Sequence, residues 1–132
     1  GFYDVAKYSK KPFVASHSCA RALCNHRRNL TDDQLKTLGN AGGIVGVNFE
    51  CSFLKEGSDR ATYDQIIEHL LYFKDKAGFG SDFDGIEDNG ELVNYGGFTT
   101  LLERMEKHFT DDEIEKICNG NALRVIRDVI GK

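Results

Sequence analysis

Short apolar runs alternate along this chain with longer segments in which apolar residues recur at helical spacing. Three runs are predicted as strands, at residues 12–16, 43–49 and 78–85. The first two are apolar without alternation, which is typical of strands in a parallel sheet, and we expect the first to be buried on both faces. The third is brief and ends in acidic residues.

Helices are predicted before, between and after these strands, at residues 1–7, 31–41, 62–78, 98–109 and 110–131. The helix at 62–78 has the clearest apolar stripe, formed by Ile66, Ile67, Leu70, Leu71 and Phe73. Thr31 and Thr110 are the predicted N-caps, and Glu113 occupies the capping-box position of the second. Residues 50–61 are predicted as a loop.

The predicted elements follow the order strand, helix, strand, helix, strand, helix. This order indicates βα units arranged around a parallel sheet. The length of 132 residues suits one domain. The sequence therefore predicts an α/β fold without internal repeats.

Net charge, apolar run length and cysteine content limit the partners and the compartment expected for this chain. The formal net charge of -4 argues against nucleic acid, because that ligand requires a basic face. No apolar run approaches the ~20 residues that cross a bilayer, so no membrane segment is expected. Four cysteines without a secretory signal indicate reduced, mostly buried thiols in a cytoplasmic compartment. A disulfide between Cys24 and Cys51 remains the alternative.

Polar residues stand where the three predicted strands end, namely His17, Asn48 and Asp82. The carboxyl ends of parallel strands meet at one edge of a sheet, where α/β proteins carry their chemistry. Taken singly, His17 would be a hydrogen-bonded structural residue and Asp82 a turn residue. Together at one edge, an imidazole and a carboxylate favour a zinc site.

The loop after the first strand holds a second set of soft ligands, namely His17, Cys19, Cys24 and His26. Their spacing lacks the C-x2-C pattern of structural zinc sites, which disfavours that alternative. The same loop contains Arg27 and Arg28. Both would be solvated, or Arg28 would bind a carboxylate through its planar guanidinium, and a substrate carboxylate is the natural ligand.

Four segments together resemble a known family: ASHSCARALCNHRRNLTDDQL, GGIVGVNF, GFGSDFDG and GNALRV. In this order they are similar to the C-terminal part of the membrane (renal) dipeptidases, zinc enzymes of the amidohydrolase superfamily built on a (β/α)8 barrel. The resemblance covers nearly the whole chain. It implies that residues 1–132 are a single partial domain, carrying about strands six to eight of an incomplete barrel.

By this resemblance, His17 would bind the second zinc of a binuclear pair and Asp82 would bind the first. Asp82 would also take the proton of a metal-bridging hydroxide as it attacks the peptide carbonyl, and pass that proton to the leaving amine. Arg28 would hold the free carboxylate of the dipeptide substrate, and Phe53 would line the substrate pocket. The metals would generate hydroxide near neutral pH and polarise the carbonyl.

The chain departs from the family pattern in two ways. The first five barrel strands and the remaining metal ligands are absent, and the crossover before Gly78 is roughly five residues shorter than in the family. Two ligands cannot complete two zinc sites, and three strands cannot close a barrel. The resemblance therefore implies a fragment that is inactive alone, whose sheet edges pair with another copy or with a complementing N-terminal segment.

Two other functions remain open at this point. The chain could be a catalytically silent assembly module that keeps the motifs as relics. It could also be a metal-binding protein in which His17 and Asp82 hold one zinc between copies. Metal content and activity on a simple dipeptide distinguish these alternatives from a dipeptidase.

Overall fold

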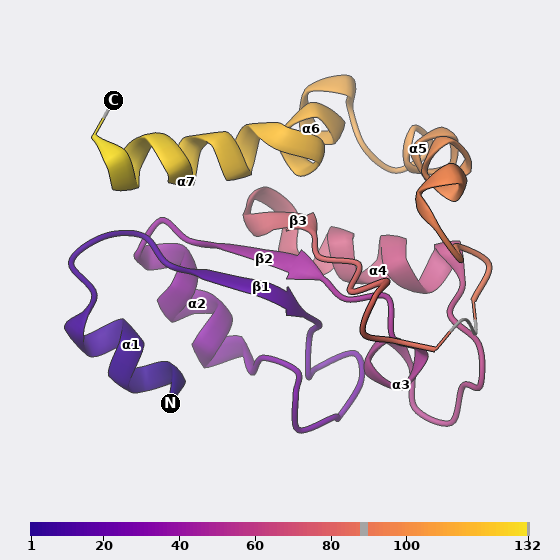
Figure 1. Cartoon of the computed structure of the whole chain (residues 1–132), viewed down its shortest axis with the longest axis horizontal. Helices are drawn as coiled ribbons and strands as arrows, with labels where there is room; N and C mark the ends of the chain where they lie inside the picture. The colour runs from indigo at the N-terminus through magenta and orange to yellow at the C-terminus, as the bar shows by residue number, and fades with distance from the viewer. Residues whose placement is uncertain (88–89, 132) are drawn as a thin grey trace.

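The centre of the fold is a three-stranded parallel sheet in the order β1-β2-β3 (Figure 1). The strands are β1 (Val14–Ser18), β2 (Ile44–Val47) and β3 (Ala77–Phe79). The computed structural model that defines them describes residues 1–87 and 90–131. The predicted mixed α/β class with a parallel sheet is confirmed.

Helices flank this sheet. The α-helices are α1 (Phe2–Tyr8), α2 (Asp32–Asn40), α3 (Cys51–Leu54), α4 (Tyr63–Phe73), α5 (Phe98–Met105), α6 (Asp111–Glu115) and α7 (Asn121–Ile130). Shorter turns are the 3-10 segments Lys74–Lys76 and Tyr95–Gly97 and the π segment Lys116–Gly120. Both predicted N-caps are confirmed, because Thr31 Oγ1 accepts from the Gln34 N–H and Thr110 Oγ1 from the Glu113 N–H.

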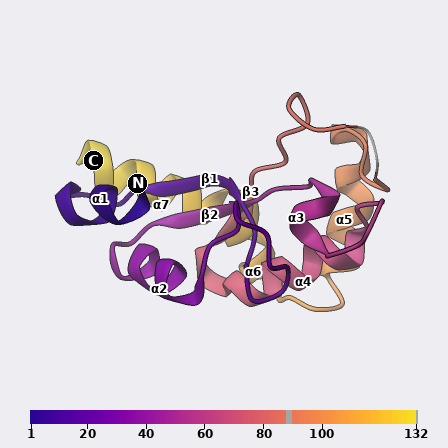
Figure 2. The ribbon, with the colours of Figure 1, turned by 90° about the horizontal axis from the view of Figure 1, so that it is seen from below.

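The core lies between one face of the sheet and the helices α2 and α4. Seen edge-on, both helices lie on the same side of the strands (Figure 2). Val45 and Val47 of the central strand are fully buried and share a face, since residues two apart on a strand point the same way. They belong to one apolar cluster with Leu38 of α2 and Leu70 of α4. Four of the five residues of the stripe predicted at 62–78 lie in this core, whereas Leu71 is exposed.

The prediction that the first strand is buried on both faces is wrong. Val14 is 49% exposed, and Ser16 and His17 are exposed as well. Within the described residues β1 pairs only with β2, so it is an edge strand, and α2 and α4 cover one face of the sheet. On the other face an apolar groove of about 310 Å³ is lined by Val14 and by Ile126 of α7.

The boundary between the predicted helix at 62–78 and the predicted strand at 78–85 is also different. The helix α4 ends at Phe73, and Lys74 takes a positive φ of 52° that no regular helix allows. Ala77 and Gly78 then pair with Val45 and Gly46 of the central strand. Pairing with β2 thus decides the conformation of a run whose apolar pattern fits either element.

Two further elements were not predicted. The segment expected to be a loop at 50–61 contains the short helix α3, whose N-cap Glu50 accepts from the Ser52 N–H. The helix predicted at 110–131 contains the π segment between α6 and α7. Such a π segment is a local interruption of the regular α-helix. Here Asn121 donates from Nδ2 to the Ala77 carbonyl at 2.9 Å, which ties α7 to β3.

Candidate active site

Two of the three predicted strand-end residues meet at the carboxyl edge of the sheet. Asn48 directly follows β2 and is fully buried, while Asp82 lies beyond the end of β3. Asn48 donates from Nδ2 to Asp82 Oδ2 at 3.2 Å, and its Oδ1 accepts from the Glu50 N–H at 2.8 Å. Both ends of the Asn48 amide are therefore used, and one of them orients the Asp82 carboxylate.

The backbone around Asp82 forms a tight turn. Asp82 has a positive φ of 62°, a conformation that side-chain-bearing residues rarely adopt. The Gly85 N–H donates to the Asp82 carbonyl at 2.8 Å, and a Cβ at Gly85 would come within 2.6 Å of Asp82 Oδ1. A glycine at position 85 therefore leaves room for the carboxylate. Unusual backbone geometry at a polar residue is a recurring feature of functional sites.

His17 lies in β1 at the same end of the sheet and is exposed. Its Nδ1 is 2.8 Å from Ser16 Oγ. When Nδ1–H donates to this hydroxyl, Nε2 is unprotonated and able to bind a metal, because the partner of one ring nitrogen sets the state of the other. The imidazole is thus compatible with a metal ligand.

The donors in this chain do not complete a metal site by themselves. His17 and Asp82 offer the imidazole and carboxylate that zinc accepts, but catalytic zinc has more protein ligands than these two. Among residues 1–87 and 90–131, no three His, Cys, Asp or Glu side chains come together as a metal-binding group. Further ligands would have to come from outside this chain.

A cluster of Arg28, Phe53 and His26 lies where the loop after β1 meets the segment after β2. The Arg28 guanidinium carbon is 5.6 Å from the centre of the Phe53 ring. The His26 ring centre is 4.5 Å from that of Phe53, and His26 Nδ1 accepts from the Arg28 N–H at 3.2 Å. The exposed guanidinium therefore has a defined aromatic neighbour, and its planar N–H donors suit a carboxylate.

Sequence reasoning missed the buried polar residues below this cluster. Asn29 donates from Nδ2 to the carbonyls of Cys24 at 2.9 Å and Phe53 at 2.8 Å. His69 of α4 is fully buried and bonds at both ring nitrogens to the same two loops. The available signal for His69 was a histidine placed inside the apolar stripe of its helix.

Three of the four cysteines, Cys19, Cys24 and Cys51, are buried, whereas Cys118 is exposed. None of the four forms a disulfide, so the alternative Cys24–Cys51 pairing is absent from the structure, and the prediction of mostly buried thiols is confirmed. Burial raises the pKa of the Cys19 thiol to about 12 and also raises the pKa of Cys24. Both thiols donate to backbone carbonyls, Cys19 to Asn48 at 3.3 Å and Cys24 to Ser52 at 3.2 Å. A zinc site built on them is therefore disfavoured.

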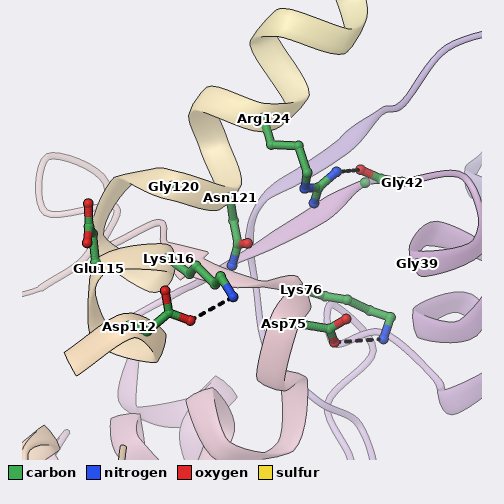
Figure 3. A pocket seen from close by; sticks show the side chains of 11 residues that line it. Gly39, Gly42, Asp75, Lys76, Asp112, Glu115, Lys116, Gly120, Asn121 and Arg124 are labelled. Carbon is green, nitrogen blue, oxygen red and sulfur yellow. Dashed lines mark hydrogen bonds and ion pairs between the residues drawn. The ribbon is translucent and has the colours of Figure 1, made fainter. Parts of the chain in front are cut away.

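A further cavity lies at the opposite, amino-terminal end of the strands. It has about 560 Å³ and is bordered by the start of β2, the turn before β3 and the π segment before α7 (Figure 3). Its charges pair with one another, Lys116 with Asp112 at 2.8 Å and Lys76 with Asp75 at 3.2 Å. Arg124 donates to the Gly42 carbonyl at 2.7 Å. Five of the charged side chains that border this cavity, Asp75, Lys76, Asp112, Lys116 and Arg124, therefore already have partners.

Metallopeptidases of known structure share this fold. The crystal structure of dipeptidase AC, a metallopeptidase of family M19, superposes with a TM-score of 0.92 at 34% identity, over 100% of this chain and 42% of its own. A metallopeptidase from Rhodobacter sphaeroides, solved with a phosphinate mimic of the dipeptide L-Ala-D-Ala, gives 0.89 at 34% identity, over 97% and 39%.

The sequence gives the family itself. The family described as Membrane dipeptidase (peptidase family M19) matches residues 1–130, so this chain belongs to the membrane dipeptidase family and the predicted resemblance is confirmed. An uncharacterised dipeptidase of Schizosaccharomyces pombe is 38% identical over 93% of the chain. The chain spans about half or less of the length of such curated relatives. No helix in its described residues has the length and apolar character needed to span a membrane.

Proposed function

We propose that this chain forms the C-terminal part of a metal-dependent dipeptidase, carrying about strands six to eight of a (β/α)8 barrel in a single partial domain. The proposal is supported by the residues that resemble the dipeptidase motifs, because they lie at the same edge of the sheet. His17 and Asp82 lie at the carboxyl ends of parallel strands, and the loops beside them hold Arg28 over Phe53. The dipeptide mimic bound to the Rhodobacter metallopeptidase supports a dipeptide as substrate.

Each of these residues has a distinct role in the proposed reaction. His17 and Asp82 would contribute two ligands to zinc, which supplies hydroxide near neutral pH and polarises the scissile carbonyl. Asp82, held by Asn48, would accept the proton of the attacking hydroxide and deliver it to the amine nitrogen as the C–N bond breaks. Arg28 would bind the free carboxylate of the dipeptide, with Phe53 lining the pocket.

The same proposal makes the isolated chain inactive. Its two candidate metal ligands need further ligands from a complementing N-terminal segment. Another copy of this chain would add only the same two side chains. The exposed edge of β1 offers a surface for such pairing, since an unpaired edge strand has free backbone donors and acceptors. We expect the purified chain to self-associate. Light scattering should report oligomers that shrink in Val14→Lys, and a monodisperse monomer at high concentration would contradict this expectation.

Elemental analysis and hydrolysis of glycyl-leucine on the same sample test the proposal. We expect zinc well below the binuclear content and no turnover for the chain alone, with the residual zinc reduced further in His17→Ala. The matched control is His108→Ala, which removes an exposed imidazole elsewhere on the chain. Equal zinc content in both variants would count against His17 as a ligand and favour the silent assembly module.

A further inference from the structure

We propose that His69 is a positioning residue, whose uncharged imidazole fixes the separation of the two loops that carry Arg28 and Phe53. The inference deepens the proposed function and rests on it for the role of those loops. His69 itself lies on α4, outside the candidate site.

The hydrogen bonds of His69 define its protonation state. The Ala20 N–H donates to Nδ1 at 3.0 Å, so Nδ1 carries no proton. The other nitrogen, Nε2, lies 2.9 Å from the Leu54 carbonyl, which can only accept. The proton must therefore sit on Nε2, and the ring is neutral in a single tautomer. Burial favours the same state, because it lowers the pKa of the imidazole.

The two partners of His69 belong to the two loops of the candidate site. Ala20 opens the loop after β1 that leads to Arg28, and Leu54 directly follows Phe53 at the end of α3. A single buried ring thus bonds to both loops at their base. Any change in its length or orientation would move one loop relative to the other.

Further contacts transmit this spacing outward to the exposed cluster. Asn29 binds the Phe53 carbonyl, and the Cys24 thiol donates to the Ser52 carbonyl. Arg28 lies over the Phe53 ring in the outermost layer. The position of the guanidinium therefore depends on contacts that begin at His69.

An apolar residue at position 69 would pack in the buried stripe of α4 but could not bond to the two loops. The ring lies in the buried stripe of α4, between Ile66 and Phe73. A side chain without polar atoms would leave the Ala20 N–H and the Leu54 carbonyl without their partners in a dry environment. The histidine is explained by what the loops need rather than by the helix.

Three variants of the full chain separate the two hydrogen bonds. His69→Asn keeps an acceptor for the Ala20 N–H, His69→Gln keeps a donor for the Leu54 carbonyl, and His69→Phe keeps ring volume without either. Hydrogen exchange at the Ala20 amide should speed up about tenfold in the Gln and Phe variants, as expected for one lost buried hydrogen bond, and stay near the parent rate in the Asn variant.

Nuclear magnetic resonance supplies a readout that general destabilisation would not move. The Arg28 Nε–H signal should be shifted by the Phe53 ring in the parent chain and lose that shift in His69→Phe. The Asn121 side-chain amide, bonded to Ala77 at a distant site, should keep its position as the control for folding. A His69→Phe chain that retains the Arg28 shift and Ala20 protection would overturn the inference.

If His69→Phe does not fold, the protonation state of His69 in the parent chain still tests the inference. The imidazole nitrogen shifts must show Nε2 protonated and Nδ1 unprotonated at pH 7; the other tautomer or a charged ring would overturn the inference. Titration with glycyl-leucine separates this inference from the proposed function. Binding that is weakened equally by Arg28→Ala and Arg27→Ala would count against the dipeptidase proposal, while the loop-positioning role is decided by the Ala20 and Arg28 signals.

Discussion

The two ends of the parallel sheet hold their polar residues in different ways. At the carboxyl end, Asn29, Asn48 and His69 are between 0% and 1% exposed and bond to loop backbone or to Asp82. At the amino end, Lys116 and Asp112 form an ion pair whose side chains are 55% and 73% exposed. These three side chains at the first end are buried away from water, whereas the ion pair at the second end remains exposed to it. Asn121, buried and bonded to the Ala77 carbonyl, is an exception at the amino end.

This difference indicates where geometry is fixed. A buried amide or imidazole that loses its partner costs free energy, so the native arrangement is held closely. Exposed ion pairs are screened by water and salt and contribute little to stability. The carboxyl end is therefore the part of the molecule built to hold loops in one position, which is what a substrate site requires.

The largest expected effect is that of removing Asn29. Asn29→Ala leaves the Cys24 and Phe53 carbonyls without a side-chain donor, and we expect the free energy of unfolding to fall by about 2–3 kcal/mol. Urea denaturation measures this loss. Asn25→Ala, in an exposed position of the same loop, is the control and should change stability much less. Equal effects of the two variants would contradict the role given to Asn29.

The next effect is a pH dependence contributed by His69. Burial lowers the pKa of His69 in the folded chain below its unfolded value of about 6.5. In that window the unfolded chain binds more protons, so stability falls as the pH falls from about 6.5 toward the lowered folded pKa. Denaturation at pH 7 and pH 5 should show a larger loss for the parent chain than for His69→Asn, which does not titrate. Identical losses would show that His69 contributes no such dependence.

A smaller effect is expected on ligand affinity at Arg28. Arg28→Lys keeps the charge but loses the planar, two-pronged donor, so affinity for glycyl-leucine should fall about tenfold in calorimetric titration. Arg27→Lys is the matched control, because Arg27 is its exposed neighbour and makes no cation–π contact with Phe53 among the described residues. Equal losses in both variants would indicate a general effect of charge on this loop.

The smallest effect should come from the amino end. Lys116→Ala removes the ion pair with Asp112, and we expect the unfolding midpoint to stay unchanged. Thermal and urea midpoints measured at low and high salt would check this. A loss as large as that of Asn29→Ala would reverse the comparison between the two ends.

The elements that local pattern controls were predicted from the sequence. Thr31 and Thr110 form N-caps as expected, and the stripe around Ile66 and Leu70 faces the core. The extent of β3 was not predicted, because pairing of Ala77 and Gly78 with the central strand depends on a distant segment. The exposure of β1 was missed for a similar reason, since a run of apolar residues does not reveal how many faces are covered.

The candidate site shows the same division. His17, Asp82, Arg28 and Phe53 were selected by type and motif, and they remain predictions as site residues. Asn48 was noticed only as a strand end, yet it orients the Asp82 carboxylate. The place of His69 inside an apolar stripe was a signal of burial, but its bonds to two other segments were not predictable, and neither was the role of Asn29, because their partners are backbone atoms. Local sequence patterns therefore identify candidate site residues, whereas the residues that hold them in place are identified only from tertiary contacts.

The most direct test of the central claim places this chain in a complete fold. The match to dipeptidase AC covers the whole length of this chain and 42% of that enzyme. The matched part of dipeptidase AC can therefore be replaced by residues 1–132 in a single chimeric chain. We predict that the chimera binds zinc and hydrolyses glycyl-leucine, that His17→Ala or Asp82→Asn abolishes turnover, and that His108→Ala does not. A chimera that folds and binds zinc but hydrolyses no dipeptide, while the parent dipeptidase does, would contradict the assignment of these residues to a dipeptidase site.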